Sequence, residues 1–245
     1  MSETITLEAH GEPFDVYLAR PPGEPVGGLV LIHEIWGLVD HIKDVADRYA
    51  AEGWLVAAPD ILSHAGVEPA LGAELFAIRT GADEEAKAAT QPRMREAMSA
   101  AHAPDYAKWA VAALRATVDR LVEEPGVGER VAVTGFCFGG TYAFALAAAD
   151  DRIRAAVPFY GTAPRSDRIA NITSPVLALY GRHDPALIDA LPDVTKAMAD
   201  AGVSFESVVY PQAGHAFFND TGPRYDVDAA ADAWRRVLAF LREHV

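Results

Sequence analysis

The sequence is poor in cysteine, with Cys137 as the single thiol among 245 residues. One thiol cannot form an intrachain disulfide, so an oxidising compartment offers this chain no internal cross-link. The N-terminal segment also lacks the basic, apolar and small-residue succession of a signal peptide. From these two absences we expect a cytoplasmic protein.

Positive charge and long hydrophobic runs are also scarce. The chain has 21 Lys and Arg against 35 Asp and Glu, which gives a formal net charge of -14. Such a charge repels nucleic acid and anionic membrane surfaces, so we expect neither as a partner. Charged residues or glycines interrupt every apolar run before the roughly 18 residues that a membrane helix needs.

Apolar residues make up 51% of the chain and charged residues 23%, which is typical of a globular protein with one large core. We find no internal repeat and no low-complexity tract. We therefore expect a single domain over 1–245, present as a monomer or a small homo-oligomer.

Short apolar runs are the main secondary-structure signal. Two alternating segments predict an antiparallel hairpin at a sheet edge, and a third alternating segment predicts the last strand. Continuous apolar runs between them are typical of strands that are covered on both faces. The hairpin is expected at 4–7 and 14–18, the covered strands at 28–32, 55–58, 131–133, 153–157 and 176–180, and the last strand at 204–210.

Segments with three-to-four spacing alternate with these strands. Helices are expected at 104–121 and 227–241, and 141–149 is apolar on nearly all sides, as in a helix that lies deep against a sheet. This alternation predicts an α/β protein with a mostly parallel sheet of about eight strands and helices on both faces. The irregular segment at about 61–103 is expected to form a helical insertion over the site.

Cys137 lies where a buried strand turns into a helix. Gly135 and Gly139 flank it at the spacing of the G-x-S-x-G elbow, with sulfur in place of the hydroxyl. Glycines are needed there because neighbouring main chain passes close to a strained turn. The alternative is a small apolar thiol packed at a strand end.

A base and an acid follow Cys137 along the chain. A thiol is mostly neutral at physiological pH and needs a base to become an efficient nucleophile. His215 follows the last predicted strand, and Asp184 follows the strand before it. The chain order of nucleophile, acid and histidine is that of the α/β-hydrolases. We expect His215 to accept the sulfhydryl proton and Asp184 to orient the imidazole.

Two backbone amides are candidates for an oxyanion hole. Phe138 begins the helix after the elbow, and Ile35 follows the predicted strand at 28–32, so both reach the same sheet edge. Their N–H groups would stabilise negative charge on an attacked carbonyl oxygen. The segment His33-Glu34-Ile35-Trp36-Gly37 is superficially similar to a zinc-binding helix, but glycine stands where the second histidine is required, so we expect no metal.

With these motifs in order, the sequence resembles the dienelactone hydrolase family over nearly its whole length. The motifs that carry the resemblance are Gly135 to Gly140, Glu34 to Gly37, Pro59-Asp60, Phe159-Tyr160-Gly161 and Ala213 to Phe217. The resemblance implies an α/β-hydrolase fold, a Cys-Asp-His triad and hydrolysis of an unsaturated lactone or related ester without a cofactor. It also implies that Glu34 contacts the resting thiol and helps to deprotonate it when substrate arrives.

Substrate contacts are predicted from the same motifs. Trp36, Tyr160 and Phe217 are candidate substrate-binding residues. Members of the family that act on dienelactone place serine directly after the catalytic histidine and arginine three residues later, to hold a substrate carboxylate. Here those positions are Ala216 and Asn219, and the arginines of the insertion are candidate substitutes, namely Arg79, Arg93 and Arg95.

The sequence thus predicts a cofactor-independent hydrolase that cleaves a small lactone or ester through Cys137 and a thioester. Two alternatives remain open. One is a carboxylesterase or acyltransferase that acts on acyclic esters. The other is a non-enzymatic redox-sensing or binding protein that uses Cys137, although a sensor thiol needs no shuttling base and the chain has no second cysteine to resolve it.

Overall fold

The computed structural model describes residues 1–101 and 103–245, and His102 falls outside them. The elements in chain order are β1 (Ser2–Ala9), β2 (Glu12–Ala19), β3 (Gly27–Ile32), α1 (Asp40–Ala51), β4 (Trp54–Pro59), η1 (Ser63–Ala65), α2 (Pro69–Thr80), α3 (Glu84–Ala101), α4 (Pro104–Val122), β5 (Val131–Phe136), α5 (Phe138–Ala147), β6 (Ile153–Phe159), α6 (Ser166–Ile169), β7 (Val176–Gly181), α7 (Pro185–Asp200), β8 (Phe205–Tyr210) and α8 (Val227–His244). None of these helices is long and apolar enough to cross a bilayer.

Within the described residues the strands form one eight-stranded sheet in the order β1-β2-β4-β3-β5-β6-β7-β8. From β4 to β8 across the sheet all neighbours pair in parallel, whereas β2 pairs antiparallel with both β1 and β4. The β1–β2 hairpin lies at one edge, as the alternating segments predict. The predicted α/β architecture, with a mostly parallel sheet of eight strands, is confirmed.

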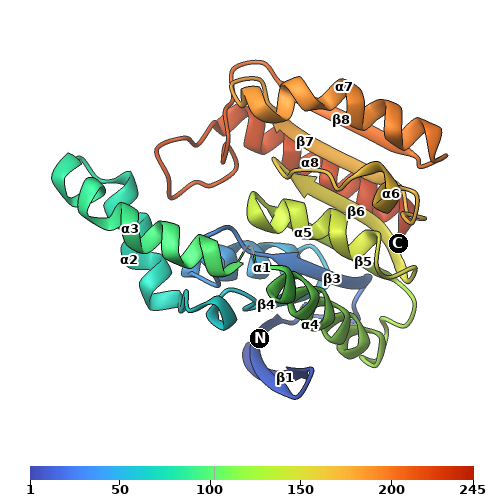
Figure 1. Cartoon of the computed structure of the whole chain (residues 1–245). Helices are drawn as coiled ribbons and strands as arrows, with labels where there is room; N and C mark the ends of the chain where they lie inside the picture. Colours follow the sequence, from blue (N-terminus) through green and yellow to red (C-terminus); the bar gives the residue numbers. More distant parts are fainter. Residues whose placement is uncertain (102) are drawn as a thin grey trace.

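Helices cover both faces of the sheet (Figure 1). The core on one face includes α4, α5 and α7, and the core on the other includes α1 and α8. In β5, Val131 and Val133 belong to the first core and Ala132 to the second, because successive side chains of a strand point to opposite faces. Every residue of β5 is buried, which explains the continuous apolar runs of the sequence.

The carboxyl ends of the parallel strands meet at one edge of the sheet, where ligand sites of open α/β folds lie. The turns after β3, β5, β7 and β8 carry Glu34, Cys137, Asp184 and His215 to this edge. The predicted insertion forms η1, α2 and α3, and Figure 1 shows α2 and α3 projecting beyond the sheet on this side, as does the loop between β8 and α8. His102, the penultimate residue of the predicted insertion, lies outside the described residues.

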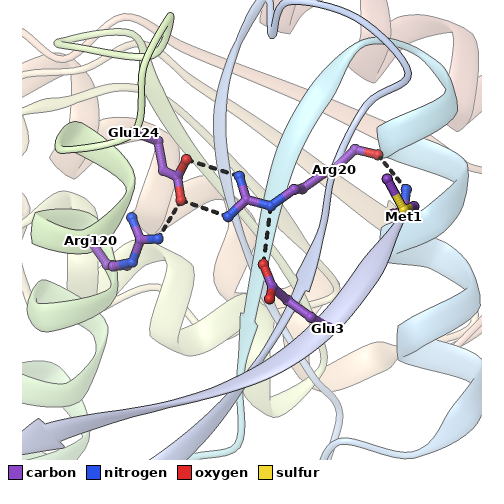
Figure 2. Close-up of polar contacts among 5 residues, drawn as sticks. All are labelled: Met1, Glu3, Arg20, Arg120 and Glu124. Carbon is purple, nitrogen blue, oxygen red and sulfur yellow. Dashed lines mark hydrogen bonds and ion pairs between the residues drawn. The ribbon is translucent and has the colours of Figure 1, made fainter.

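A charged cluster joins three elements at the other end of the parallel strands, on the side of their amino ends (Figure 2). Arg20, directly after β2, donates from Nη1 and Nη2 to the two carboxylate oxygens of Glu124, each at 2.9 Å. Its Nε donates to Glu3 of β1 at 3.1 Å, and Arg120 of α4 also pairs with Glu124. Because β2 runs opposite to β4, its last residues lie at the amino end of β4, away from the turns that carry the candidate site.

Candidate active site

The turn between β5 and α5 has the strained geometry that the glycine spacing predicts. Cys137 has φ 56° and ψ −112°, a backbone conformation that residues other than glycine rarely adopt. A Cβ on Gly135 would collide with the carbonyl oxygen of Gly139, and a Cβ on Gly139 would collide with the carbonyl oxygens of Ile32 and His33. The turn therefore packs backbone to backbone against the end of β3.

Backbone strain gathers around Cys137. The described residues include four non-glycine residues with positive φ, and three of them are Cys137, Tyr160 at 37° and Ala216 at 64°. Tyr160 follows β6, and its ring centroid lies 5.0 Å from that of His215, which precedes Ala216. Strained residues of this kind persist where the surrounding structure holds them in place, and they concentrate at functional sites.

His215 and Asp184 lie side by side, as their positions after β8 and β7 predict. Nδ1 of His215 lies 2.5 Å from Oδ2 of Asp184, within hydrogen-bonding distance. The imidazole donates through Nδ1, so Nε2 is left to act as a base. His215 and Cys137 line the same cavity.

The thiol of Cys137 is kept neutral by its surroundings. Burial, together with the negative charges of Glu34 and Asp184, raises its pKa to about 12. The backbone N–H groups of Phe138 and Ile35 act in the opposite direction and lower the pKa of the thiol. The two amides named from the sequence thus converge on the atom that would attack substrate.

Glu34 is a buried carboxyl with one strong polar partner. Its side chain is 3% exposed, and burial raises its pKa to about 7 against the opposing effect of Asn219. Nδ2 of Asn219 donates to Oε2 of Glu34 at 2.6 Å. Oδ1 of Asn219 accepts from the backbone N–H and the hydroxyl of Thr221, at 3.1 and 2.6 Å. These two bonds orient the amide so that its NH₂ group faces Glu34.

The cavity beside Cys137 has a volume of about 400 Å³. Its lining comes from the turn after β3, the elbow, the insertion helices α2 and α3, and the loop between β8 and α8. The lining residues are Glu34, Ile35, Trp36, Phe76, Arg79, Thr80, Lys87, Cys137, His215, Ala216, Asn219, Gly222, Pro223 and Arg224. The insertion therefore supplies one wall of the cavity.

Of the predicted substrate-binding residues, the structure brings Trp36 to the cavity, where its ring meets the ring of Phe76 edge-on at 5.4 Å. Tyr160 is buried and does not line the cavity. Burial raises the pKa of its hydroxyl, and the negative charges of Glu34 and Cys137 add to the effect. Phe217 has no exposed surface and packs in the core against Phe159, Tyr160 and Tyr210, so it does not line the cavity.

Of the arginines predicted to bind a substrate carboxylate, one lines the cavity and two do not. Arg93 and Arg95 are absent from the cavity lining, and Nη1 of Arg93 instead pairs with Glu74 at 2.9 Å. Arg79 does line the cavity, from the last turn of α2. The face that a helical residue presents depends on how the helix docks, and sequence spacing alone does not show this for α3.

Some cavity residues were not singled out from the sequence. Phe76, Lys87 and Arg224 line the cavity, and Asn219 was identified only as a departure from the dienelactone pattern, not as the partner of Glu34. Lys87 and Arg224 have no motif around them that signals a site. Among the described residues no group of three or more His, Cys, Asp or Glu side chains is arranged to hold a metal ion.

The fold and the order of these turns define the chain as an α/β-hydrolase. The family model described as "Dienelactone hydrolase family" matches residues 14–245. The chain belongs to this family, whose members are hydrolases that act on ester bonds.

Similar proteins agree over nearly the full length. A provisionally named carboxymethylenebutenolidase of Saccharolobus solfataricus is 31% identical over 99% of this chain and 98% of its own. Protein usf of Aquifex pyrophilus is 31% identical over 100% of both chains. The crystal structure of a provisionally named dienelactone hydrolase from Klebsiella pneumoniae superposes with a TM-score of 0.83 at 29% identity and covers 98% of each chain.

Proposed function

We propose that the protein hydrolyses small lactones or esters by covalent catalysis at Cys137, with His215 as the base and Asp184 as its orienting partner. The observation that carries the proposal is one cavity lined by both the thiol and the imidazole, with Nδ1 of that imidazole bonded to a carboxylate. This is the arrangement that an activated nucleophile requires.

In the first half of the reaction, Nε2 of His215 takes the sulfhydryl proton and the sulfur attacks the carbonyl carbon. A C–S bond forms, and the carbonyl oxygen gains negative charge, which the N–H groups of Ile35 and Phe138 stabilise by donating hydrogen bonds to it. The C–O bond to the leaving group then breaks, and the imidazolium returns its proton to the departing oxygen. The product is a thioester on Cys137, and an opened lactone stays attached through it.

In the second half, His215 takes a proton from water and the resulting hydroxide attacks the thioester. The C–S bond breaks, sulfur recovers a proton from the imidazolium, and the carboxylic acid product leaves. Asp184 stays ionised throughout and stabilises the imidazolium in both halves.

Glu34 acts on the resting thiol in this proposal. Its carboxyl lies close enough that its charge raises the pKa of Cys137. A neutral thiol is a poor target for oxidation, because the thiolate is the reactive species. The raised pKa also argues against a redox sensor, whose thiol needs a lowered pKa.

The cavity favours a small substrate with an unsaturated or aromatic part and a negative charge. Trp36 and Phe76 offer aromatic surface, and Arg79, Lys87 and Arg224 offer positive charge. Among the described residues, Arg79 and Arg224 make no ion pair, so their charges are available to a ligand, whereas Lys87 pairs with Glu84 at 2.7 Å. These cations would replace the serine and arginine that dienelactone-specific relatives place where Ala216 and Asn219 stand here.

The nucleophile and base are tested with p-nitrophenyl acetate and a panel of small lactones. Cys137→Ala should abolish turnover, and His215→Ala should lower kcat by about 100- to 10,000-fold. His183→Ala is the matched control, because His183 is exposed beside Asp184 and does not line the cavity, and it should keep wild-type turnover.

After incubation of the wild type and of Cys137→Ser with substrate, mass spectrometry should detect an acyl adduct on residue 137. The preferred panel member decides between lactone and acyclic ester. Turnover retained by folded Cys137→Ala, or an adduct on another residue, would contradict the proposal.

A further inference from the structure

His33 is a buried histidine that the reaction proposed above does not use. It directly follows β3, and its side chain has no exposed surface. Its ring lies parallel to the ring of Phe138, at an interplanar angle of 2° and a centroid distance of 5.9 Å. The carbonyl oxygen of His33 also lies against Gly139, where a Cβ would collide with it. His33 therefore packs between the end of β3 and the elbow.

The hydrogen bonds of His33 define its tautomer. The backbone N–H of Ile61 donates to Nε2 at 3.2 Å, so Nε2 carries no proton. Nδ1 then carries the proton of the neutral ring and donates to the carbonyl oxygen of Glu34 at 2.7 Å. Burial lowers the pKa of His33, against the opposing charge of Asp60, which favours this neutral form. Ile61 is itself held by Tyr106, whose hydroxyl donates to its carbonyl at 2.8 Å.

The carbonyl of Glu34 and the N–H of Ile35 are the two ends of one planar peptide group, and in a trans peptide they point in opposite directions. A bond that holds the carbonyl on one side therefore directs the N–H to the other side, toward Cys137, whose pKa this N–H lowers. The N–H of Gly37 donates to the same carbonyl at 3.1 Å, so the peptide is held by two donors.

We propose that His33 is a positioning residue for the oxyanion hole. It touches neither substrate nor sulfur, and it acts through the peptide between Glu34 and Ile35, which its Nδ1–H holds in place. Its stacking on Phe138 supports the residue that supplies the second donor. The inference rests on the proposed function, because an oxyanion hole has a role only if Cys137 attacks a carbonyl group.

Two substitutions separate this role from simple packing. His33→Asn keeps an N–H donor at the place of Nδ1 and so preserves the bond to Glu34. His33→Gln moves its polar atoms to the place of Nε2 and loses that bond. The matched control is His41→Gln, which removes another buried histidine, on α1, that does not line the cavity.

With p-nitrophenyl acetate as the probe, His33→Gln should lose about tenfold or more in kcat with KM within about threefold of wild type, because an oxyanion donor acts chiefly in the transition state. His33→Asn and His41→Gln should each stay within about threefold of wild-type kcat. Equal losses in His33→Asn and His33→Gln, or a folded His33→Gln with wild-type kcat, would overturn the inference. Turnover that persists in Cys137→Ala would instead reject the proposed function.

A second measurement needs neither a variant nor turnover. Nitrogen-15 NMR of the wild type labelled at histidine should show His33 protonated on Nδ1 and bare on Nε2, although free histidine favours the opposite tautomer. Nδ1–H protection from solvent exchange should accompany this signature. A proton on Nε2 would leave the Glu34 carbonyl without a donor from His33 and overturn the inference, even if His33→Gln failed to fold.

Discussion

At the scale of single residues, the site combines a thiol that resists ionisation with a carboxyl that does the same. The pKa of Cys137 is raised to about 12 and that of Glu34 to about 7, and burial is the largest cause in both cases. The two effects are linked, because the charge of an ionised Glu34 contributes to the raised pKa of the thiol. The single amide of Asn219, oriented by Thr221, is the polar partner that favours the charged form of Glu34.

Glu34→Gln should therefore make Cys137 more reactive in the resting enzyme. The substitution removes a nearby negative charge and keeps an oxygen that can accept from Asn219. We expect the rate of alkylation by iodoacetamide at about pH 8.5 to rise severalfold, because one pKa unit is about a tenfold change in thiolate population. Cys137 is the only thiol, so every adduct reports on this site.

Glu24→Gln is the control for that experiment, since Glu24 is exposed and does not line the cavity. It should react at the wild-type rate. An unchanged rate in Glu34→Gln would mean that the charge of Glu34 does not act on the thiol.

At the scale of elements, the elbow depends on close backbone contact. Gly139→Ala would push a methyl group into the carbonyl oxygens at the end of β3, which are backbone atoms and cannot swing aside. We expect a loss of about 2 to 3 kcal/mol in the free energy of unfolding, as in other overpacked cores, together with a loss of turnover. Urea denaturation followed by circular dichroism measures the first effect.

Gly23→Ala is the matched control, because a Cβ at Gly23 meets nothing within 4 Å and this glycine has no positive φ. Its stability should change by less than about 0.5 kcal/mol. If Gly139→Ala were as stable as Gly23→Ala, the tight contact between the elbow and β3 would be contradicted.

The insertion helices set the charge of the cavity wall. Arg79→Ala should raise KM for an ester that carries a carboxylate by about tenfold, and should change KM for a neutral ester much less, because a lost charge contact costs roughly 1 to 2 kcal/mol. Arg93→Ala is the matched control, since Arg93 lies outside the cavity and pairs with Glu74. Equal changes of KM for the charged and neutral esters would exclude Arg79 from binding the anion.

At the scale of the whole molecule, the carboxyl and amino ends of the parallel strands carry different groups of residues. The carboxyl edge carries strained turns and raised pKa values, whereas the amino edge carries the cluster of Arg20, Glu124, Arg120 and Glu3, which joins β1, β2 and α4. The bond from Arg20 and the charges of both arginines lower the pKa of Glu124, against its burial. A carboxyl with a lowered pKa stabilises the fold above its ordinary pKa, and this contribution is lost as the pH falls.

Glu124→Gln should therefore lower the free energy of unfolding by about 1 kcal/mol near pH 7. The loss is small because Arg20 is partly exposed and solvent screens its interaction with Glu124. The difference in the free energy of unfolding between Glu124→Gln and the wild type should shrink as the pH falls below about 4.5, because the wild-type carboxyl then loses its charge. Urea denaturation at several pH values measures it, and turnover at neutral pH should not change.

Glu129→Gln is the matched control, because Glu129 is exposed and its partner Arg154 is half exposed. It should alter stability by less than about 0.5 kcal/mol at any pH. A pH-independent loss in Glu124→Gln would contradict the assignment of its stability to the charged carboxylate.

The sequence by itself determined the architecture and the placement of the proposed reacting groups at one end of the sheet. Both depend on short-range patterns, namely continuous apolar runs, the glycines around Cys137, and the order of Asp184 and His215 after successive strands. Parallel strands bring their carboxyl ends together whatever the packing details, so residues after those strands must meet at one edge. The helix α7 was less apparent, because Met198 is its one buried side chain and Pro192 lies inside it.

Tertiary structure alone decided what surrounds those groups. Asn219 and Glu34 are 185 residues apart and meet only because the loop after β8 folds over the end of β3. Likewise, docking of α2 and α3 turns Arg79 toward the cavity and leaves Arg93 outside it, and Phe217 is buried by the core beneath His215. The side of a helix or loop that faces a site depends on contacts with distant segments, and local spacing carries no information about those contacts.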